Sequence, residues 1–242
     1  MESTRPRPNR ISYGPEPSQH YELWLPEAPR AAILLIHGGS WLSRYDLSHL
    51  NPLCEALVDQ GYAVANLEYR RIGNPGGGWP GTFEDVGSGF AAAHSRLPGL
   101  PWVVLGHSAG GLLALHLGTT SRDMAAVVAL APLSCLQWPQ QSSTTRESVG
   151  RLLGGTPEEI PEVYGAACPS GRTSLVPQCL LHGEADEAVP LEMSRHFCAL
   201  RGLDPCPVTL LALPGVDHFQ IIDPQSTARE PLFAALEKAS RH

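Results

Sequence analysis

The sequence alternates short apolar runs with helix-like segments along most of its length. The apolar runs are residues 31–37, 62–67, 102–105, 125–131, 178–182 and 208–213. Runs of this length between helical segments predict a mostly parallel β-sheet that is buried on both faces. Residues 20–25 alternate polar and apolar side chains and predict a half-buried edge strand. The expected fold class is therefore α/β, with a central sheet of about seven or eight strands and helices on both faces.

The segments between the runs predict the helices and the domain organisation. Helices are expected over residues 47–60, 82–97, 110–119, 190–201 and 228–240. Thr82 and Asp85 have the spacing of a capping box at the start of one of them. Residues 137–172 are polar, with short helices expected near 149–153 and 157–164, and we interpret them as a short cap-like insertion over one end of the sheet. Residues 1–10 are polar and Pro-rich and are expected to be a flexible tail, which leaves 11–242 as a single domain.

Charge and cysteine usage exclude several classes of partner. The chain has 17 Lys and Arg residues against 24 Asp and Glu, a formal net charge of −7. Nucleic-acid-binding proteins need a basic face, so we expect no nucleic acid partner. No apolar run in the sequence approaches the ~20 residues that span a bilayer, so we expect no membrane partner. Residues 1–10 contain no apolar segment, so we expect no signal peptide. The 6 cysteines lack a CxxC or zinc-like spacing, so we expect reduced thiols and neither a metal nor a cofactor. Together these features predict a cytoplasmic protein.

The residues that follow the run 102–105 have the pattern of a nucleophile elbow. Gly106, His107, Ser108, Ala109 and Gly110 spell G-x-S-x-G between a predicted strand and a predicted helix. Glycine on both sides of the serine permits the sharp turn that exposes its oxygen above the sheet. We therefore predict Ser108 as a nucleophile, and we predict that the Ala109 amide stabilises an oxyanion.

The residues that follow the run 31–37 predict the second half of an oxyanion hole. Gly38, Gly39 and Ser40 come after His37 in an H-G-G-S-W sequence, and any of their three amides is a candidate donor. His37 is interpreted as a brace of this loop. Trp41 is a candidate wall of a substrate pocket.

The loops after the last two runs supply an acid and a base. Asp186 follows the run 178–182, with Glu184 and Glu187 as rivals at short range. His218 follows the run 208–213, and its neighbour Asp217 is interpreted as a residue that braces the loop. The order Ser108, Asp186, His218 is that of hydrolases built on a parallel sheet. The remaining candidate pocket walls, each equally compatible with a role in core packing, are Trp79, Leu133, Trp138 and Phe219.

These motifs resemble the α/β-hydrolase superfamily, and within it the kynurenine formamidase (arylformamidase) and carboxylesterase branch. The matching segments are 13–14, 23–26, 37–41, 69–70, 79–80, 84–85, 106–111, 182–183 with 186 and 189–190, and 217–219 with 221. The resemblance implies an α/β-hydrolase fold and a metal-free serine hydrolase. It implies a small-molecule ester, or an activated amide such as N-formylkynurenine, as the substrate. It also implies that a homodimer is one alternative for the assembly.

Two other functions remain open from the sequence. The first is a peptidase of the prolyl-oligopeptidase type, although that family normally carries a large additional domain. The second is a non-catalytic ligand-binding or interaction module on a hydrolase fold, because a fold does not fix a function. The presence of Ser108, Asp186 and His218 together favours the hydrolase.

Overall fold

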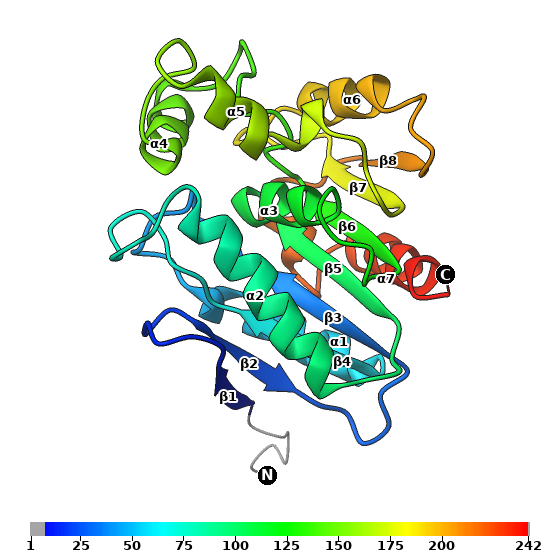
Figure 1. Ribbon diagram of the computed structural model, residues 1–242. Helices are drawn as coiled ribbons and strands as arrows, with labels where there is room; N and C mark the ends of the chain where they lie inside the picture. Colours follow the sequence, from blue (N-terminus) through cyan, green and yellow to red (C-terminus); the bar gives the residue numbers. More distant parts are fainter. Residues whose placement is uncertain (1–7, 242) are drawn as a thin grey trace.

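The computed structural model describes residues 8–241 and contains one sheet of eight strands. The order in the sheet is β1-β2-β4-β3-β5-β6-β7-β8 (Figure 1). The pairs β1–β2 and β2–β4 are antiparallel, and all other pairs, β4–β3 included, are parallel. The strands are β1 Asn9–Ser12, β2 His20–Trp24, β3 Ala31–Ile36, β4 Tyr62–Leu67, β5 Trp102–His107, β6 Ala126–Leu130, β7 Gln178–Gly183 and β8 Val208–Leu213. The expected mostly parallel α/β sheet is confirmed.

Helices cover both faces of the sheet. They are α1 Asn51–Asp59, α2 Gly81–Arg96, α3 Ala109–Leu117, α4 Ser143–Leu153, α5 Pro161–Ala167, α6 Leu191–Leu200 and α7 Arg229–Ala239, with short 3₁₀ turns at Leu47–Leu50, Pro169–Gly171 and Gln220–Ile222. Helices α2, α3 and α6 pack on one face, with α4 and α5 beyond them, and α1 and α7 pack on the other (Figure 1). The central strands explain the two layers, because Leu34 of β3 faces the first core and its neighbour Leu35 faces the second.

The structure corrects the expected tail. Asn9 and Arg10 belong to β1, where they pair with Leu23 and Glu22 of β2. Of the rest of the expected flexible tail, Pro8 lies just before β1, and residues 1–7 lie outside the described residues. Strand β1 has no apolar run and a largely exposed pattern, so pairing with β2 rather than burial holds it in place.

The expected capping box is wrong. Helix α2 begins at Gly81 after Pro80, and its cap makes no side-chain hydrogen bond. The Thr82 hydroxyl donates to the Arg70 carbonyl oxygen, and the Asp85 carboxylate is paired with the Arg70 guanidinium at 2.7 Å. Both side chains therefore tie α2 to the segment after β4 instead of closing the first turn.

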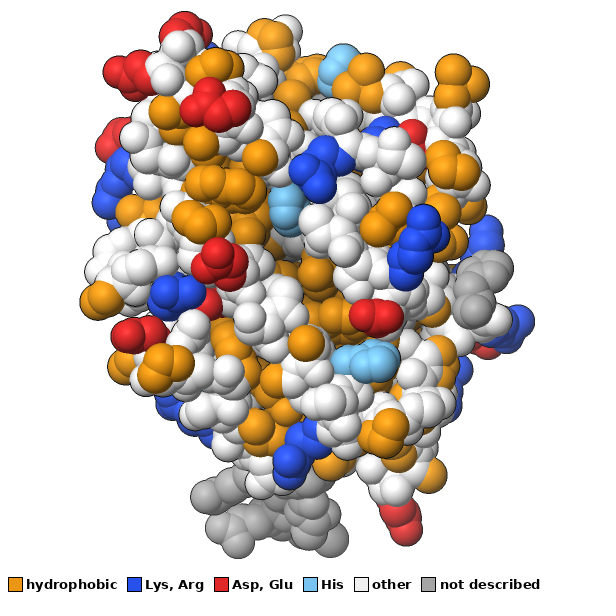
Figure 2. Space-filling view, viewed as in Figure 1, with side chains coloured by type: hydrophobic (Ala, Val, Ile, Leu, Met, Phe, Trp, Pro, Cys, Tyr) orange, Lys and Arg blue, Asp and Glu red, His pale blue; other side chains and the backbone are white. Residues whose placement is uncertain are grey.

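The surface carries charges of both signs. On the face in view in Figure 2, acidic and basic side chains are interspersed, and neither kind gathers into one large patch. Among residues 8–241, no helix combines the length and the apolar character that crossing a bilayer requires.

Candidate active site

Ser108 lies on the sharp turn between β5 and α3. Its φ of 55° and ψ of −118° are unusual for a residue with a side chain. A Cβ atom at Gly106 would lie 2.3 Å from the Gly110 carbonyl oxygen, and one at Gly110 would lie 2.3 Å from the Ile36 carbonyl oxygen. Only glycine fits on either side of the serine, which is the constraint expected of a nucleophile elbow.

Ser108, His218 and Asp186 form one hydrogen-bonded chain. Ser108 Oγ lies 3.0 Å from His218 Nε2, and His218 Nδ1 lies 2.7 Å from Asp186 Oδ2. The three residues come from the loops after β5, β8 and β7, which meet at the carboxyl edge of the sheet. Because the carboxylate accepts a hydrogen bond from Nδ1–H, the neutral ring presents a bare Nε2 to the serine hydroxyl. Such an arrangement can take the proton from the serine oxygen.

The Asp186 carboxylate is held by its own loop. Its Oδ1 accepts hydrogen bonds from the amides of Ala188 and Val189, both at 2.8 Å. Burial raises the pKa of Asp186, but the hydrogen bonds from His182 and His218 outweigh burial and hold that pKa well below its usual range. Asp186 is therefore ionised at neutral pH.

The rival carboxylates do not join the chain. Glu184 and Glu187 are exposed. The Asp217 carboxylate accepts the amides of Phe219 and Gln220, both at 2.8 Å, so it braces the loop that carries His218.

The loop after β3 reaches the same edge. Gly39 and Ser40 line the cavity beside Ser108, as does Ala109, whose amide is in the first turn of α3 and has no partner within the helix. Gly38 does not line the cavity, because its backbone packs against Ser108 and His107. Trp41 is fully buried, and its indole N–H donates to the Ala109 carbonyl oxygen at 3.2 Å, which ties the two amide-bearing segments together.

A buried charged cluster supports that loop, and sequence reasoning missed its centre. Glu68 Oε1 lies 3.0 Å from His37 Nε2 and 3.1 Å from Arg71 Nη1, while Glu68 Oε2 accepts the Leu47 amide at 3.2 Å. The Tyr69 hydroxyl donates to the His37 carbonyl oxygen at 2.8 Å. Although burial raises the pKa of Glu68, hydrogen bonding and charge from His37, with the charge of Arg71, lower it overall. The signal in the sequence was an acidic residue placed directly after a largely apolar strand.

A cavity of about 710 Å³ opens beside Ser108. Of the predicted walls, Trp41, Leu133 and Phe219 line it. Its polar lining was not predicted and comes from the loop after β3 and from α4: Arg44, Tyr45, Asp46, Ser48, His49, Thr145 and Ser148. These residues carry no motif, and only the folded chain brings them to the site.

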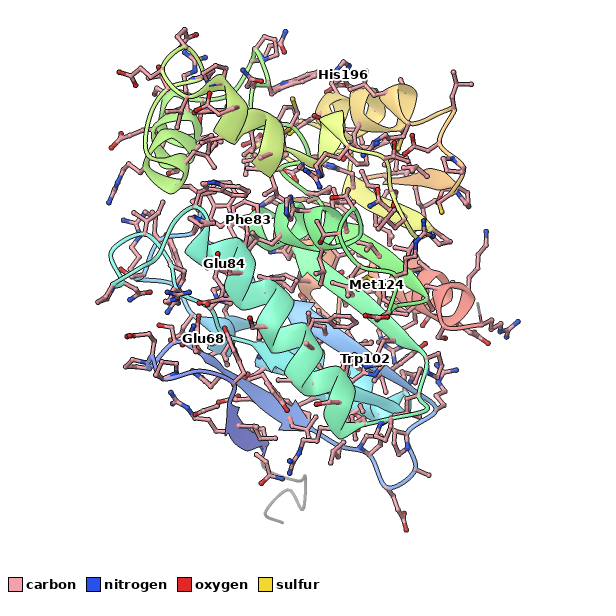
Figure 3. All side chains as sticks on the ribbon, viewed as in Figure 1. Glu68, Phe83, Glu84, Trp102, Met124 and His196 are labelled. Atoms are coloured by element: carbon pink, nitrogen blue, oxygen red, sulfur yellow. The ribbon has the colours of Figure 1, made fainter. Side chains whose placement is uncertain are left out.

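The structure places the other two predicted walls elsewhere, and for them the prediction is wrong. The Trp79 ring packs against Phe83, which points from α2 towards α3 and contacts His116 there (Figure 3). The Trp138 ring lies 5.4 Å from the ring of His196, which Figure 3 shows on α6. Both indoles are partly buried against the core on the side of α2, α3 and α6. Aromatic packing, not substrate contact, explains them.

Among residues 8–241, no group of three or more His, Cys, Asp or Glu side chains is arranged to hold a metal ion.

Comparison with known proteins shows the family to which the chain belongs. The BD-FAE family model matches residues 22–200, which is more than half of the chain. The chain belongs to the BD-FAE family. This BD-FAE member is also similar to esterase LipQ of Mycobacterium tuberculosis. The two sequences are 26% identical over an alignment of 257 residues, gaps included, which covers 93% of this chain and 59% of LipQ. The chain therefore spans 59% of the length of that curated relative.

Solved structures support the fold of this BD-FAE member. A truncated carbohydrate esterase from gut microbiota superimposes with a TM-score of 0.79 at 18% identity, covering 100% of this chain and 99% of the other. Esterase Est2 of Thermogutta terrifontis has a TM-score of 0.75 at 20% identity, covering 96% of this chain and 91% of its own. These likenesses show the α/β-hydrolase fold.

Proposed function

We propose that this protein is a serine hydrolase that cleaves carboxylic esters of small molecules through an acyl-enzyme. The observation that carries the proposal is the chain from Ser108 Oγ to His218 Nε2 at 3.0 Å and from His218 Nδ1 to Asp186 at 2.7 Å, beside an open cavity. The names of its relatives, LipQ and Est2, agree with ester hydrolysis.

The proposed reaction follows the roles of a Ser-His-Asp triad. Ser108 Oγ attacks the ester carbonyl carbon while His218 Nε2 takes the hydroxyl proton, and His218 then gives that proton to the departing alcohol. A water molecule, deprotonated by His218, hydrolyses the acyl-enzyme and releases the acid. Asp186 keeps the imidazole in the required tautomer and stabilises the imidazolium, for which its ionised state at neutral pH is suited.

We assign to backbone amides the role of stabilising the negative charge that develops on the carbonyl oxygen of the substrate. Ala109 is one donor, because its amide has no partner within the helix and the residue lines the cavity beside Ser108. Gly39 or Ser40 supplies the other, since both line the cavity and Gly38 does not. Removing one such donor typically costs about 2.7–4 kcal/mol of transition-state stabilisation.

The proposed substrate class includes activated amides. A cavity of about 710 Å³ is in the ordinary range for sites that hold a small molecule. An arylformamidase-like activity on N-formylkynurenine uses the same attack on a carbonyl, so the two substrate types are compared in one assay. The acyl and alcohol groups that the polar wall of the cavity prefers follow from the same panel.

The deciding experiment measures kcat/KM for N-formylkynurenine and for short-chain p-nitrophenyl esters, together with labelling by a fluorophosphonate. The protein should hydrolyse the esters and be labelled, and Ser108→Ala should lose both, with kcat lowered on the order of 10⁴-fold or more. Good ester turnover with background activity on N-formylkynurenine rejects the formamidase activity alone. An unlabelled, inactive protein favours the non-catalytic module, and cleavage of prolyl peptides instead of esters favours the peptidase.

A further inference from the structure

His107 is a buried imidazole that the proposed reaction does not use. It lies in the G-x-S-x-G motif, at the end of β5, and is 3% exposed. Its Nε2 lies 2.9 Å from the carbonyl oxygen of His218, which is 111 positions away in the sequence. Because a carbonyl oxygen only accepts, Nε2 must carry the proton and Nδ1 must be bare. The hydrogen bond therefore fixes the tautomer of His107.

The surroundings of His107 keep its ring neutral. Burial, and then the charge on the neighbouring His218, lower the pKa of His107 to about 3. Its Nδ1 has no hydrogen-bond partner among the described residues. A Cβ atom at Gly38 would lie 3.3 Å from that nitrogen, so the loop after β3 packs against the bare side of the ring. The ring is thus enclosed between the loop after β3 and the loop after β8.

The bond to His107 is a main restraint on the base. Within residues 8–241, His107 is the only hydrogen-bond partner of the His218 carbonyl group. The two rings also pack with centroids 4.8 Å apart. His107 directly precedes Ser108, so this one contact joins the peptide that carries the base to the strand that carries the nucleophile.

We propose that His107 is a positioning residue that sets the distance between the His218 imidazole and the Ser108 hydroxyl by donating its Nε2 proton to the His218 carbonyl group. The inference rests on the proposed function, because it assigns His218 as the base. A displacement of about 1 Å of a catalytic group can cost 10²-fold in rate. Removal of the donor should therefore lower kcat and leave KM nearly unchanged, since His107 presents only 3% of its surface and the other residues that line the cavity stay as they are.

Three substitutions of His107 separate the donor from the bulk of the ring. His107→Gln places an amide N–H at the position of Nε2, His107→Asn carries the same amide on a side chain too short to reach it, and His107→Leu fills the space without a donor. We expect kcat for p-nitrophenyl butyrate to stay within about 3-fold of the native value in the Gln variant. It should fall about 10–100-fold in the Asn and Leu variants, with KM within about 2-fold.

Thermal unfolding of each variant shows whether it is folded. The native protein and Ser108→Ala serve as the active and inactive references. Rescue by Gln and not by Asn supports the inference, and that pair decides the question even if the Leu variant does not fold. Equal kcat in the Gln and Asn variants, or a loss that appears in KM instead of kcat, overturns the inference about His107. The proposed function still stands in that case, provided that the native protein is active. A native protein that hydrolyses no ester and takes no fluorophosphonate overturns both.

Discussion

His182 Nε2 lies 3.4 Å from Asp186 Oδ2, and the side chains of both residues are fully buried. The same His182 nitrogen bonds the Val189 carbonyl oxygen at 2.9 Å, and its Nδ1 lies 2.7 Å from the Ser194 hydroxyl. Asp186 is therefore held by β7 and α6 as well as by His218. The scaffold thus orients the acid through contacts that do not involve the base, which is the property that a residue needs if it is to fix an imidazole.

Replacing Asp186 by Asn should abolish most of the activity. An amide at this position can hold His218 in the wrong tautomer, and loss of the charge removes stabilisation of the imidazolium, so kcat should fall about 10⁴-fold. Steady-state hydrolysis of a p-nitrophenyl ester measures this. Asp217→Asn is the matched control, since its carboxylate oxygen accepts only amides of its own loop, and it should keep kcat close to the native value. The reverse ranking would show that Asp186 is not the acid.

Gly110→Ala should destabilise the fold. The new Cβ atom would lie 2.3 Å from the Ile36 carbonyl oxygen and 2.4 Å from that of His37, and neither backbone group can move away cheaply. The free energy of unfolding should fall by about 1–3 kcal/mol or more in a denaturant titration.

Gly87→Ala is the control for that change. Gly87 lies within α2, and its added Cβ would meet nothing within 4 Å. Because glycine is a poor helix former, this substitution should raise the free energy of unfolding by about 0.5–1 kcal/mol. Similar effects of the two substitutions would contradict the close packing of the elbow.

Glu68→Gln should weaken both the fold and the reaction. It leaves the buried Arg71 without its carboxylate partner and loosens the loop that carries Gly39 and Ser40. Removing one member of a buried ion pair typically costs about 3–5 kcal/mol, which urea unfolding would detect. Figure 3 labels both Glu68 and the control, Glu84, which is an exposed residue in the first turn of α2. Glu84→Gln should change the unfolding free energy by less than about 0.5 kcal/mol, and an equal loss in both variants would refute the role of the cluster.

His116 should make the fold sensitive to mild acid. Burial, and then the charge of Arg172, lower its pKa to about 4, whereas in the unfolded chain it takes up a proton below about pH 6.5. Its contribution is therefore complete above pH 6.5 and is lost as the pH falls towards 4, because the unfolded state binds the proton first. Urea unfolding from pH 7.5 to 4.5 should show a shallower decline for His116→Gln than for the native protein. Parallel curves would rule out His116 as a source of the decline.

The central strands and the hydrogen-bonded chain were predictable because their signals are local. Strands β3 and β4 are buried on both faces, so their apolar runs mark them without knowledge of their neighbours. In a parallel sheet, the loops after the strands meet at one edge, which brings Ser108, Asp186 and His218 together once their order is known.

Other features depend on partners that lie far away in the sequence, and the sequence did not reveal them. Strand β1 exists through its pairing with β2. Thr82 bonds the Arg70 carbonyl oxygen instead of capping α2, since the chain after β4 supplies a nearer partner. Trp79 and Trp138 are large aromatic residues of the kind that often line pockets. Whether such a ring contacts substrate or the core depends on where the folded backbone places its side chain.

The position of the strands that carry the site also bears on how the protein acquires its activity. The nucleophile follows β5 and the base follows β8, with β6 and β7 between them in the sheet. No turnover is possible until these four parallel strands have paired across a stretch of chain from Trp102 to Leu213. Such long-range pairings close slowly compared with local helices. After dilution from denaturant, esterase activity should thus return later than the helical circular dichroism signal and should report completion of this half of the sheet.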